Sequence, residues 1–356
     1  MRPHLLFITR NYPPRVGGLE TFSYHLIREF QEDGVALKIA LRKAKPHLAW
    51  FLPYGLLRAI ALCRRHSIRH VHLCDGLLAP IGVLLKRALG VRLSITVHGL
   101  DVTFSFPGYQ RLIPGCLRRM DRIVCVSRAT RAACLTRGVP AVKCEVIPNG
   151  IDPRAVAPPP DPGRLLREVE RRCAFSLDGR RVLLTVGRLV PRKGVAWFVQ
   201  NVMPRLPGEF VYLIAGDGPE RERLDRLIRD AGMRGRAALL GRVTDALRNA
   251  LLARADVCIM PNISVPGDME GFGIAALEAG AAGVPVVASD LEGIRDAVLH
   301  GVTGYRVPEK DGAAFVDAIL RLRLDRPSIR EAVCATFGWP AVADRYRRFL
   351  FVCDSR

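Results

Sequence analysis

The sequence predicts an α/β protein made of two doubly wound parallel-sheet domains. Short apolar runs alternate with helical patterns along residues 4–148. These runs are apolar at successive positions, which is typical of parallel strands covered on both faces. A proline-rich break follows at residues 153–163, and the same alternation then starts again. A length of 356 residues agrees with two domains.

The first half supplies six candidate strands. Helical patterns such as residues 19–34 separate them, as expected for strands joined by helical crossovers. We place these strands at residues 4–9, 36–41, 70–74, 92–99, 122–127 and 144–148.

The second half repeats this organisation after the proline-rich break, which excludes a continuous helix or an inner strand. We therefore predict one domain over residues 1–160 and a second over 161–338. In such sheets ligands bind beyond the carboxyl ends of the strands, so two facing domains would enclose a central cleft. The candidate strands are residues 181–187, 210–216, 236–241, 256–262 and 284–289.

The net charge of +20 is concentrated in the first half. Residues 1–152 contain 23 Lys and Arg against 9 Asp and Glu. This excess predicts an anionic partner for the first domain, although solvated helix faces would also explain it. Nucleic acid is not expected, because there is no helix-turn-helix pattern and no aromatic-rich basic strand.

The ten cysteines include no CxxC pair. This pattern favours reduced, buried thiols in a cytoplasmic protein over a disulfide frame or a zinc site, and we expect no metal. The first ten residues lack a secretory pattern. The longest apolar stretch, residues 47–63, is interrupted by Pro53 and Arg58 and is shorter than the roughly 20 residues of a spanning helix.

In each predicted domain, a glycine-containing loop follows the first candidate strand. Gly17 and Gly18 precede a helical pattern, an arrangement that lets backbone N–H groups approach a phosphate. Arg188 and Lys193 follow the strand at residues 181–187, and two cations there suit a diphosphate. A plain tight turn and a solvated basic loop are the alternative interpretations.

His98 follows another candidate strand of the first domain. It could donate to a substrate hydroxyl or phosphate, or take part in proton transfer. A purely structural histidine remains the alternative.

The stretch EGFGIAALE, which begins at Glu270, combines a glycine turn with two acids. Gly271 and Gly273 allow close backbone approach, and a helix starting near Ile274 offers N–H groups to a phosphate. Because carboxylates repel phosphate, Glu270 and Glu278 suit sugar hydroxyls instead. The stretch therefore suggests a phosphate flanked by two sugars, as in a nucleotide-sugar; an ordinary helix with one salt-bridged glutamate is the alternative.

Six motifs in this order resemble those of the retaining GT-B glycosyltransferases of family 4. They are GGLE, HGLD, PNGID, VGRLVPRKG, AGDGP and EGFGIAALE, and they span nearly the whole chain. The resemblance implies two Rossmann-like domains facing a central cleft, and a C-terminal helix over residues 339–356 that crosses back to the first domain. It also implies a metal-independent hexosyltransferase (EC 2.4) without a cofactor, which uses a UDP- or GDP-linked sugar.

The resemblance further implies roles for individual residues. The transferred sugar would contact His98 and Glu270, and the diphosphate would bind Arg188 and Lys193. Glu278 would hold the ribose hydroxyls. The remaining donor contacts would come from Gly17, Gly18, Arg242, Val243, Gly271, Phe272, Gly273 and Ile274.

Two stretches depart from the family pattern. Residues 43–65 are unusual in a region that commonly shapes acceptor binding, and residues 292–296 replace a Gly-Gly-x-x-Glu pattern. The expected acceptor is a saccharide or lipid-linked sugar of surface polysaccharide or glycan assembly. The basic first domain, with Trp50, Phe51 and Tyr54, would dock peripherally on the inner face of the cytoplasmic membrane. The alternative is a non-catalytic nucleotide-sugar or polyanion-binding protein on the same scaffold.

Overall fold

The computed structural model describes residues 4–14, 17–41, 48–173 and 175–351. The chain divides into two compact units, which we call unit 1 and unit 2. Unit 1 comprises Met1–Gly150, Gly267–Phe272 and Trp339–Arg356. Unit 2 comprises Ile151–Pro266 and Gly273–Gly338. The division near Gly150 precedes the boundary at residue 160 that we inferred from the prolines.

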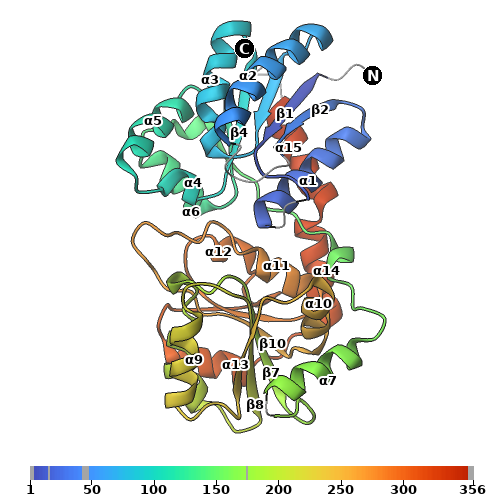
Figure 1. The fold of residues 1–356 in the computed structure, drawn as a ribbon, viewed down its shortest axis with the longest axis vertical. Coiled ribbons are helices and arrows are strands. Elements are labelled where there is room, and N and C mark those ends of the chain that lie inside the picture. The colour runs from blue at the N-terminus through green and yellow to red at the C-terminus, as the bar shows by residue number, and fades with distance from the viewer. Residues whose placement is uncertain (1–3, 15–16, 42–47, 174, 352–356) are drawn as a thin grey trace. The chain divides into compact units, whose positions relative to one another are not determined.

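Unit 1 is built on a parallel six-stranded sheet in the order β2-β1-β3-β4-β5-β6, coloured blue to green in Figure 1. Each of the six predicted strands forms, with ends that differ by a few residues from those expected. The strands are β1 Leu5–Thr9, β2 Ala36–Ala40, β3 His70–Leu73, β4 Arg92–Val97, β5 Arg122–Cys125 and β6 Cys144–Val146.

Strand β1 shows why continuous apolar runs become inner strands. Successive side chains point to opposite faces of a sheet. Leu5 and Phe7 pack in one apolar cluster, and Leu6 and Ile8 pack in another on the opposite face. All four side chains are fully buried, so both faces must be covered by helices.

Two helical layers provide this cover. Residues of α2, α3 and α5 pack in the cluster of Leu6 and Ile8, and residues of α1 and α15 pack in the cluster of Leu5 and Phe7. The helices are α1 Gly18–Glu32, α2 Leu48–His66, α3 Ala79–Leu89, α4 Leu100–Thr103, α5 Pro107–Leu117, α6 Arg128–Leu135 and α15 Trp339–Phe351, with 3₁₀ turns at Gly76–Leu78 and Ala141–Lys143. Within the described residues, no helix is both long and apolar enough to cross a membrane.

Helix α15 belongs to unit 1 although it ends the chain. Its Tyr346 hydroxyl lies 2.9 Å from the Thr96 hydroxyl, and Arg347 pairs with Asp33 at 2.6 Å. A Cβ on Gly150 would lie 2.4 Å from the Trp339 ring, so this close approach requires glycine. Helix α15 therefore completes the core of unit 1.

Unit 2 repeats the architecture with the strand order β12-β11-β10-β7-β8-β9, again all parallel. Five of these strands were predicted, and β12 was not. Tyr305 and Arg306 of β12 are half-buried, so this short edge strand lacks the continuous apolar run of its neighbours. The strands are β7 Arg181–Val186, β8 Phe210–Ala215, β9 Ala237–Gly241, β10 Val257–Met260, β11 Val286–Ser289 and β12 Gly304–Val307.

The helices of unit 2 cover both faces of its sheet (Figure 1). They are α7 Pro162–Cys173, α8 Val195–Asn201, α9 Arg221–Asp230, α10 Asp245–Arg254, α11 Ile274–Ala281, α12 Ile294–Ala297, α13 Gly312–Leu320 and α14 Arg326–Phe337, with 3₁₀ turns at Pro153–Val156, Pro191–Lys193 and Met203–Arg205. The prolines of the predicted break supply the 3₁₀ turn at Pro153–Val156 and the first residue of α7.

The strand orders define where each unit can bind a ligand. In unit 1 the strands are added first on one side of β1 and then on the other, so the strand order switches between β1 and β3. In unit 2 the strand order switches between β7 and β10 in the same way. Ligands of doubly wound sheets bind at the carboxyl ends of the strands at such switch points. The residues directly after β1, β3, β7 and β10 are therefore the first candidates for a site.

Candidate active site

The loop after β7 lies at the switch point of unit 2. Gly194 has a φ of 63°, and a Cβ there would lie 1.8 Å from the carbonyl oxygen of Pro261, which follows β10. The Ile263 amide also donates to the Arg192 carbonyl at 2.9 Å. These backbone contacts bring the ends of β7 and β10 together and hold the loop that contains Lys193.

The two predicted cations lie in this loop. Arg188 is exposed and Lys193 is half-buried. The pKa of the Cys258 thiol in β10 is raised to about 12, mainly by burial and also by the Glu278 carboxylate, while the Lys193 ammonium opposes this increase. The charges of Lys193 and Glu278 therefore both lie near Cys258 in unit 2.

Helix α11 begins at the carboxyl end of β10, where a Cβ on Gly273 would lie 3.1 Å from the Met260 side chain. Gly273, at its N-cap, has a φ of 96°, a left-handed conformation that favours glycine. The first N–H groups of a helix have no partner inside the helix and favour an anion. Ile274 begins the helix, and Glu278 lies one turn further on. Gly273, Ile274 and Glu278 thus lie on one continuous element of unit 2, whereas Gly271 of the predicted anion cradle belongs to unit 1.

Arg248 of α10 is a further member of this cluster, which the sequence did not reveal. Its Nη1 lies 3.5 Å from Oε1 of Glu278 and 3.0 Å from Oδ1 of Asp245. Burial raises the pKa of Glu278 above its ordinary value, and Arg248 lowers it. Arg248 therefore favours the ionised carboxylate, the form that accepts two hydrogen bonds from a diol.

The predicted base-binding residues precede α10. Arg242 is exposed and Val243 is half-buried in the loop after β9. Gly241 turns the chain with a φ of 67°. This loop leads directly to Arg248, so the structure connects it to the Glu278 cluster through the start of α10.

In unit 1, His98 follows β4 and is held from several sides. Its Nε2 lies 3.0 Å from the Cys74 carbonyl oxygen, which can only accept, so Nε2 carries a proton. Its ring also packs edge-on against Phe22. The Asp101 carboxylate accepts from the His98 amide at 2.7 Å and from the Gly76 amide at 2.9 Å. Asp101 is thus a positioning residue within the motif HGLD that was not among the predicted site residues.

The segment Gly267–Phe272 also belongs to unit 1. A Cβ on Gly271 would lie 1.8 Å from the carbonyl oxygen of His98, so this contact requires glycine. Glu270 is buried with 9% of its surface exposed, and Phe272 is buried. The structure therefore brings the Glu270 segment to the His98 turn, two features that are 172 positions apart by the sequence numbering.

The glycine pair near the first strand lies at the start of α1. Gly17 is its N-cap and Gly18 its first residue. A Cβ on Gly17 would lie 2.4 Å from Oε2 of Glu20, whose side chain is buried. This acid folds back over the helix start, a feature that we did not predict and that disfavours a second anion at Gly17 itself.

An ion pair occupies the switch point of unit 1. Arg10, after β1, contacts Asp75, after β3, at 2.9 Å. Burial raises the pKa of Asp75, and Arg10 lowers it. Among the described residues, Oδ2 of Asp75 is buried without a hydrogen-bond partner. The sequence offered only one signal for this pair. Arg10 directly follows the buried strand β1, and Asp75 follows β3 after one more buried residue, Cys74.

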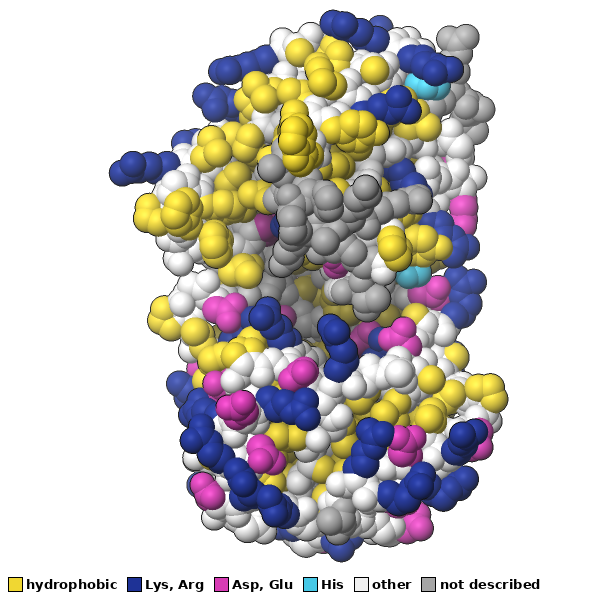
Figure 2. Space-filling view, in the orientation of Figure 1, with side chains coloured by type: hydrophobic (Ala, Val, Ile, Leu, Met, Phe, Trp, Pro, Cys, Tyr) yellow, Lys and Arg dark blue, Asp and Glu magenta, His cyan; other side chains and the backbone are white. Residues whose placement is uncertain are grey.

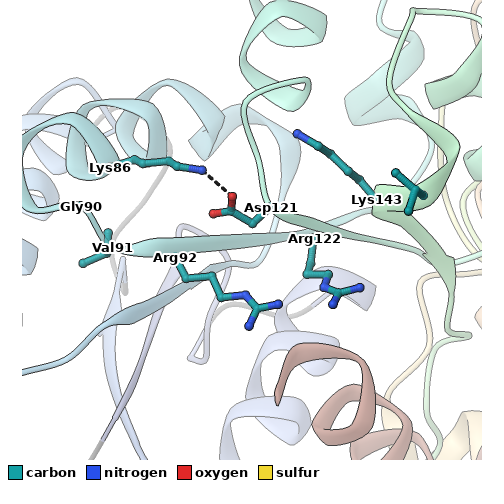
Figure 3. A pocket seen from close by; sticks show the side chains of 8 residues that line it. Lys86, Gly90, Val91, Arg92, Asp121, Arg122 and Lys143 are labelled. Atoms are coloured by element: carbon teal, nitrogen blue, oxygen red, sulfur yellow. Dashed lines mark hydrogen bonds and ion pairs between the residues drawn. The ribbon is translucent and has the colours of Figure 1, made fainter. Parts of the chain in front are cut away.

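A basic recess of about 520 Å³ lies at the opposite, amino edge of the unit 1 sheet. Figure 3 shows Arg92 and Arg122 at the starts of β4 and β5, with Lys86 pointing to Asp121 at 2.5 Å. Lys143 lines the same recess and donates to the Arg118 carbonyl at 2.9 Å. Because ligands of such sheets bind at the carboxyl edge, we do not include this recess in the candidate site.

Comparison with known proteins decides the family. The family Glycosyl transferases group 1 matches residues 180–325, and Glycosyltransferase Family 4 matches residues 16–155. A GDP-mannose-dependent alpha-(1-6)-phosphatidylinositol monomannoside mannosyltransferase of Mycolicibacterium smegmatis is 31% identical over 350 residues, covering 90% of this chain and 89% of that protein. The chain belongs to glycosyltransferase family 4. The predicted family and the predicted glycosyltransferase activity are thus confirmed.

Other relatives of this glycosyltransferase match over similar lengths. The protein of the same description from Mycobacterium tuberculosis is 29% identical and covers 97% of each chain. An alpha-D-kanosaminyltransferase of Streptomyces kanamyceticus is 28% identical over 85% of this chain and 78% of its own.

Solved structures confirm the predicted GT-B fold class. Anabaena HepE in complex with UDP superposes with a TM-score of 0.74 at 17% identity, covering 97% of this glycosyltransferase and 99% of HepE. Sucrose-phosphate synthase of Thermosynechococcus elongatus superposes with a TM-score of 0.76 at 21% identity, covering 97% and 98%. At these identities the likeness shows the fold alone.

Proposed function

We propose that the glycosyltransferase moves a sugar from a nucleoside-diphosphate sugar to an acceptor hydroxyl, with retention of anomeric configuration and without a metal ion or other cofactor. The observation that supports this most is the cluster at the switch point of unit 2. It combines Lys193, the start of α11 and the Arg248–Glu278 pair. This set suits a diphosphate beside a ribose diol.

The proposed donor contacts follow from the charges of these groups. Negative charge develops on the diphosphate as the bond to the sugar breaks. Arg188, Lys193 and the first N–H groups of α11 would stabilise that charge, because fixed donors need little reorganisation during the reaction. Glu278 would accept from the ribose hydroxyls. Backbone groups of Arg242 and Val243 would contact the base.

The sugar and the acceptor would meet residues of unit 1. We propose that Glu270 and His98 contact hydroxyls of the transferred sugar. In the retaining step, the bond between the anomeric carbon and the phosphate oxygen breaks, and a bond to the acceptor oxygen forms on the same face. The acceptor proton passes to the leaving phosphate oxygen. Glu270 is therefore proposed as a binding residue and not as a nucleophile.

We propose GDP-mannose as the first donor to test and a lipid-linked saccharide or inositol lipid as the acceptor. The two mycobacterial relatives, at 29% and 31% identity, are described as GDP-mannose-dependent and as acting on phosphatidylinositol monomannoside. We also propose a cytoplasmic location, because the nine described cysteines are free and eight of them are buried.

The test measures release of nucleoside diphosphate from GDP-mannose, UDP-glucose and ADP-glucose by purified protein, with and without a lipid acceptor. We expect acceptor-dependent release with one donor, unchanged by EDTA, and a product that keeps the donor's anomeric configuration by NMR. Binding of donor without any release or transfer would support a non-catalytic binding protein instead. An inverted product would overturn the retaining mechanism.

A further inference from the structure

Exposed large apolar side chains are concentrated on unit 1. Among the described residues, twelve such side chains are at least 36% exposed, and ten of them belong to unit 1. Those in unit 2 are Val302 and Leu320. Single exposed apolar residues are normal on a soluble surface, so the uneven distribution is the informative feature.

Helix α2 shows the strongest exposure. Trp50, Tyr54 and Leu57 are 79%, 58% and 68% exposed. Their spacing of four and then three residues puts them on one side of the helix. The residues Phe51, Ala59 and Cys63 form the buried stripe that packs on the sheet. Helix α2 is therefore apolar both toward the core and toward the outside, which folding alone does not require.

The neighbouring helices extend this surface. Leu84 of α3 and Leu112 of α5 are 47% and 54% exposed, and Phe106, at the N-cap of α5, is 63% exposed. Helix α3 packs against both α2 and α5. Figure 2 shows apolar side chains gathered over these helices. We call Trp50, Tyr54, Leu57, Leu84, Phe106 and Leu112 the docking face.

The charged residues on the three helices of the docking face have one sign. Helices α2, α3 and α5 contain no Asp or Glu in their sequences. They do contain the exposed residues Arg58, Arg64, Arg65, Arg87 and Arg111. A solvated helix such as α9 of unit 2 instead mixes both signs and pairs Arg229 with Asp225. The three helices that form the docking face thus contribute apolar side chains and only cationic charges.

We propose that the docking face binds the surface of an anionic lipid bilayer, an inference that rests on the proposed lipid acceptor. Aromatic side chains such as Trp50 and Tyr54 favour the boundary between headgroups and acyl chains. The arginines would contact lipid phosphates, because cationic side chains are attracted to an anionic bilayer surface. A second copy of the chain is disfavoured as the occupant, because a two-fold contact would oppose like charges.

The docking face also adjoins the acceptor side of the candidate site within unit 1. Helix α4 begins two residues after His98 and packs against α5. Leu100 and Phe104, on and just after α4, are 44% and 48% exposed. A lipid acceptor could therefore present its headgroup near His98 while its acyl chains stay in the bilayer.

The test is co-sedimentation of the full chain with vesicles of phosphatidylcholine alone or with phosphatidylglycerol. We expect binding to the anionic vesicles, weakened by salt. The triple variant Trp50→Ser, Tyr54→Ser, Leu57→Ser should bind roughly a hundredfold less, because three partly buried side chains at about 1 kcal/mol each total about 3 kcal/mol, and about 1.4 kcal/mol is tenfold. The variant Arg58→Ser, Arg64→Ser, Arg65→Ser should lose the preference for anionic vesicles.

Matched controls change similar residues on unit 2. The double variant Val302→Ser, Leu320→Ser and the triple variant Arg164→Ser, Arg167→Ser, Arg171→Ser of α7 should bind as the wild type does. Equal binding by the α2 variants and their controls would overturn the proposal. The proposal would also be overturned if the wild type bound neither kind of vesicle. It would likewise be overturned if light scattering showed a dimer that the α2 substitutions abolish.

Donor turnover separates this proposal from the proposed function. Without acceptor, all these variants should hydrolyse the donor and release nucleoside diphosphate at the slow wild-type rate, since none of the substituted residues is a proposed donor contact. Retained turnover with lost vesicle binding supports both proposals. If the protein binds vesicles but shows no turnover, the result would contradict the proposed donor chemistry. The co-sedimentation result would still support the docking face.

Discussion

The guanidinium of Arg248 lies 3.5 Å from the Glu278 carboxylate, with 18% and 22% of the two side chains exposed. The two residues come from different helices, α10 and α11. At this depth, the charge of one partner controls the protonation of the other more strongly than it would in bulk water. The pair therefore links the proposed ribose contact to pH.

We predict that Arg248→Leu shifts the pH dependence of donor binding. Without the guanidinium, burial would raise the pKa of Glu278 further above its ordinary value. Donor affinity can be measured by calorimetry from about pH 8 down to about pH 5. As the pH is lowered, the affinity of the variant should begin to fall at a higher pH than that of the wild type. Asp245→Asn is the matched control, because Asp245 is exposed and raises the same pKa. An unchanged acid limb in Arg248→Leu would contradict the role of the pair.

Glu278→Gln should weaken donor binding without a loss of stability at neutral pH. The raised pKa means that the folded state binds more protons than the unfolded state between the two pKa values. The contribution of Glu278 to stability therefore falls as the pH rises through that window and stays unfavourable above it. Glutamine carries no charge, so it removes the free-energy cost of burying the carboxylate. Arg248 still has an ionic partner in the variant, because Asp245 lies 3.0 Å away. Chemical denaturation and nucleotide titration at two pH values measure both effects; a large loss of stability at neutral pH would count against this assignment.

Lys193→Ala and Arg188→Ala should each reduce turnover far more than stability. Both side chains are at least partly exposed, so their removal leaves no buried cavity. Loss of one fixed donor to a developing anion costs roughly 10²–10³-fold in kcat. Stopped assays of donor turnover and thermal unfolding provide the comparison. Arg229→Ala, on the exposed surface of α9, is the control and should retain full turnover.

Glu270→Ala should impair sugar transfer more than it impairs binding of the bare nucleoside diphosphate. Its proposed partner is the transferred sugar, which the bare nucleotide lacks. Glu278→Ala should weaken the binding of both ligands to a similar extent, because both contain the ribose that Glu278 is proposed to contact. Titration of each variant with GDP-mannose and with GDP distinguishes the two roles. Equal losses for both ligands in Glu270→Ala would refute the sugar-binding role.

Gly271→Ala should abolish most activity by displacing the segment that contains Glu270. A Cβ at this position would lie 1.8 Å from the His98 carbonyl oxygen, so the two backbones must separate. Gly208→Ala is the matched control, because no atom lies within 4 Å of its Cβ. Circular dichroism should show an intact fold in both variants. Full activity in Gly271→Ala would mean that this close approach is not needed for catalysis.

Local patterns predicted the strands well where both faces are buried. In β1, Leu5, Leu6, Phe7 and Ile8 form an uninterrupted apolar run because each face meets its own helical layer. Strand β12 escaped prediction because it is a short edge strand in which Tyr305 and Arg306 are half-buried. Half-buried strands such as β2 and β9 were still predicted from their apolar runs, whereas the run in β12 is interrupted by Arg306.

The residue pairs of the candidate site were beyond the sequence. Arg10 meets Asp75 across 65 positions, and Arg248 meets Glu278 from another helix. Nothing in the local pattern of either partner specifies the other, because strand order brings them together. The close approach of Gly271 to His98 has the same origin.

The sequence by itself determined the alternation of strands and helices, the glycine turns at strand ends and the family, because these are properties of neighbouring residues and their spacing. Only the tertiary structure decided which charges meet, that the segment Gly267–Phe272 joins unit 1, and that the exposed stripe of α2 continues over α3 and α5. The physical reason is that side-chain pairing and surface exposure depend on strand order and helix packing, which join residues far apart in the chain.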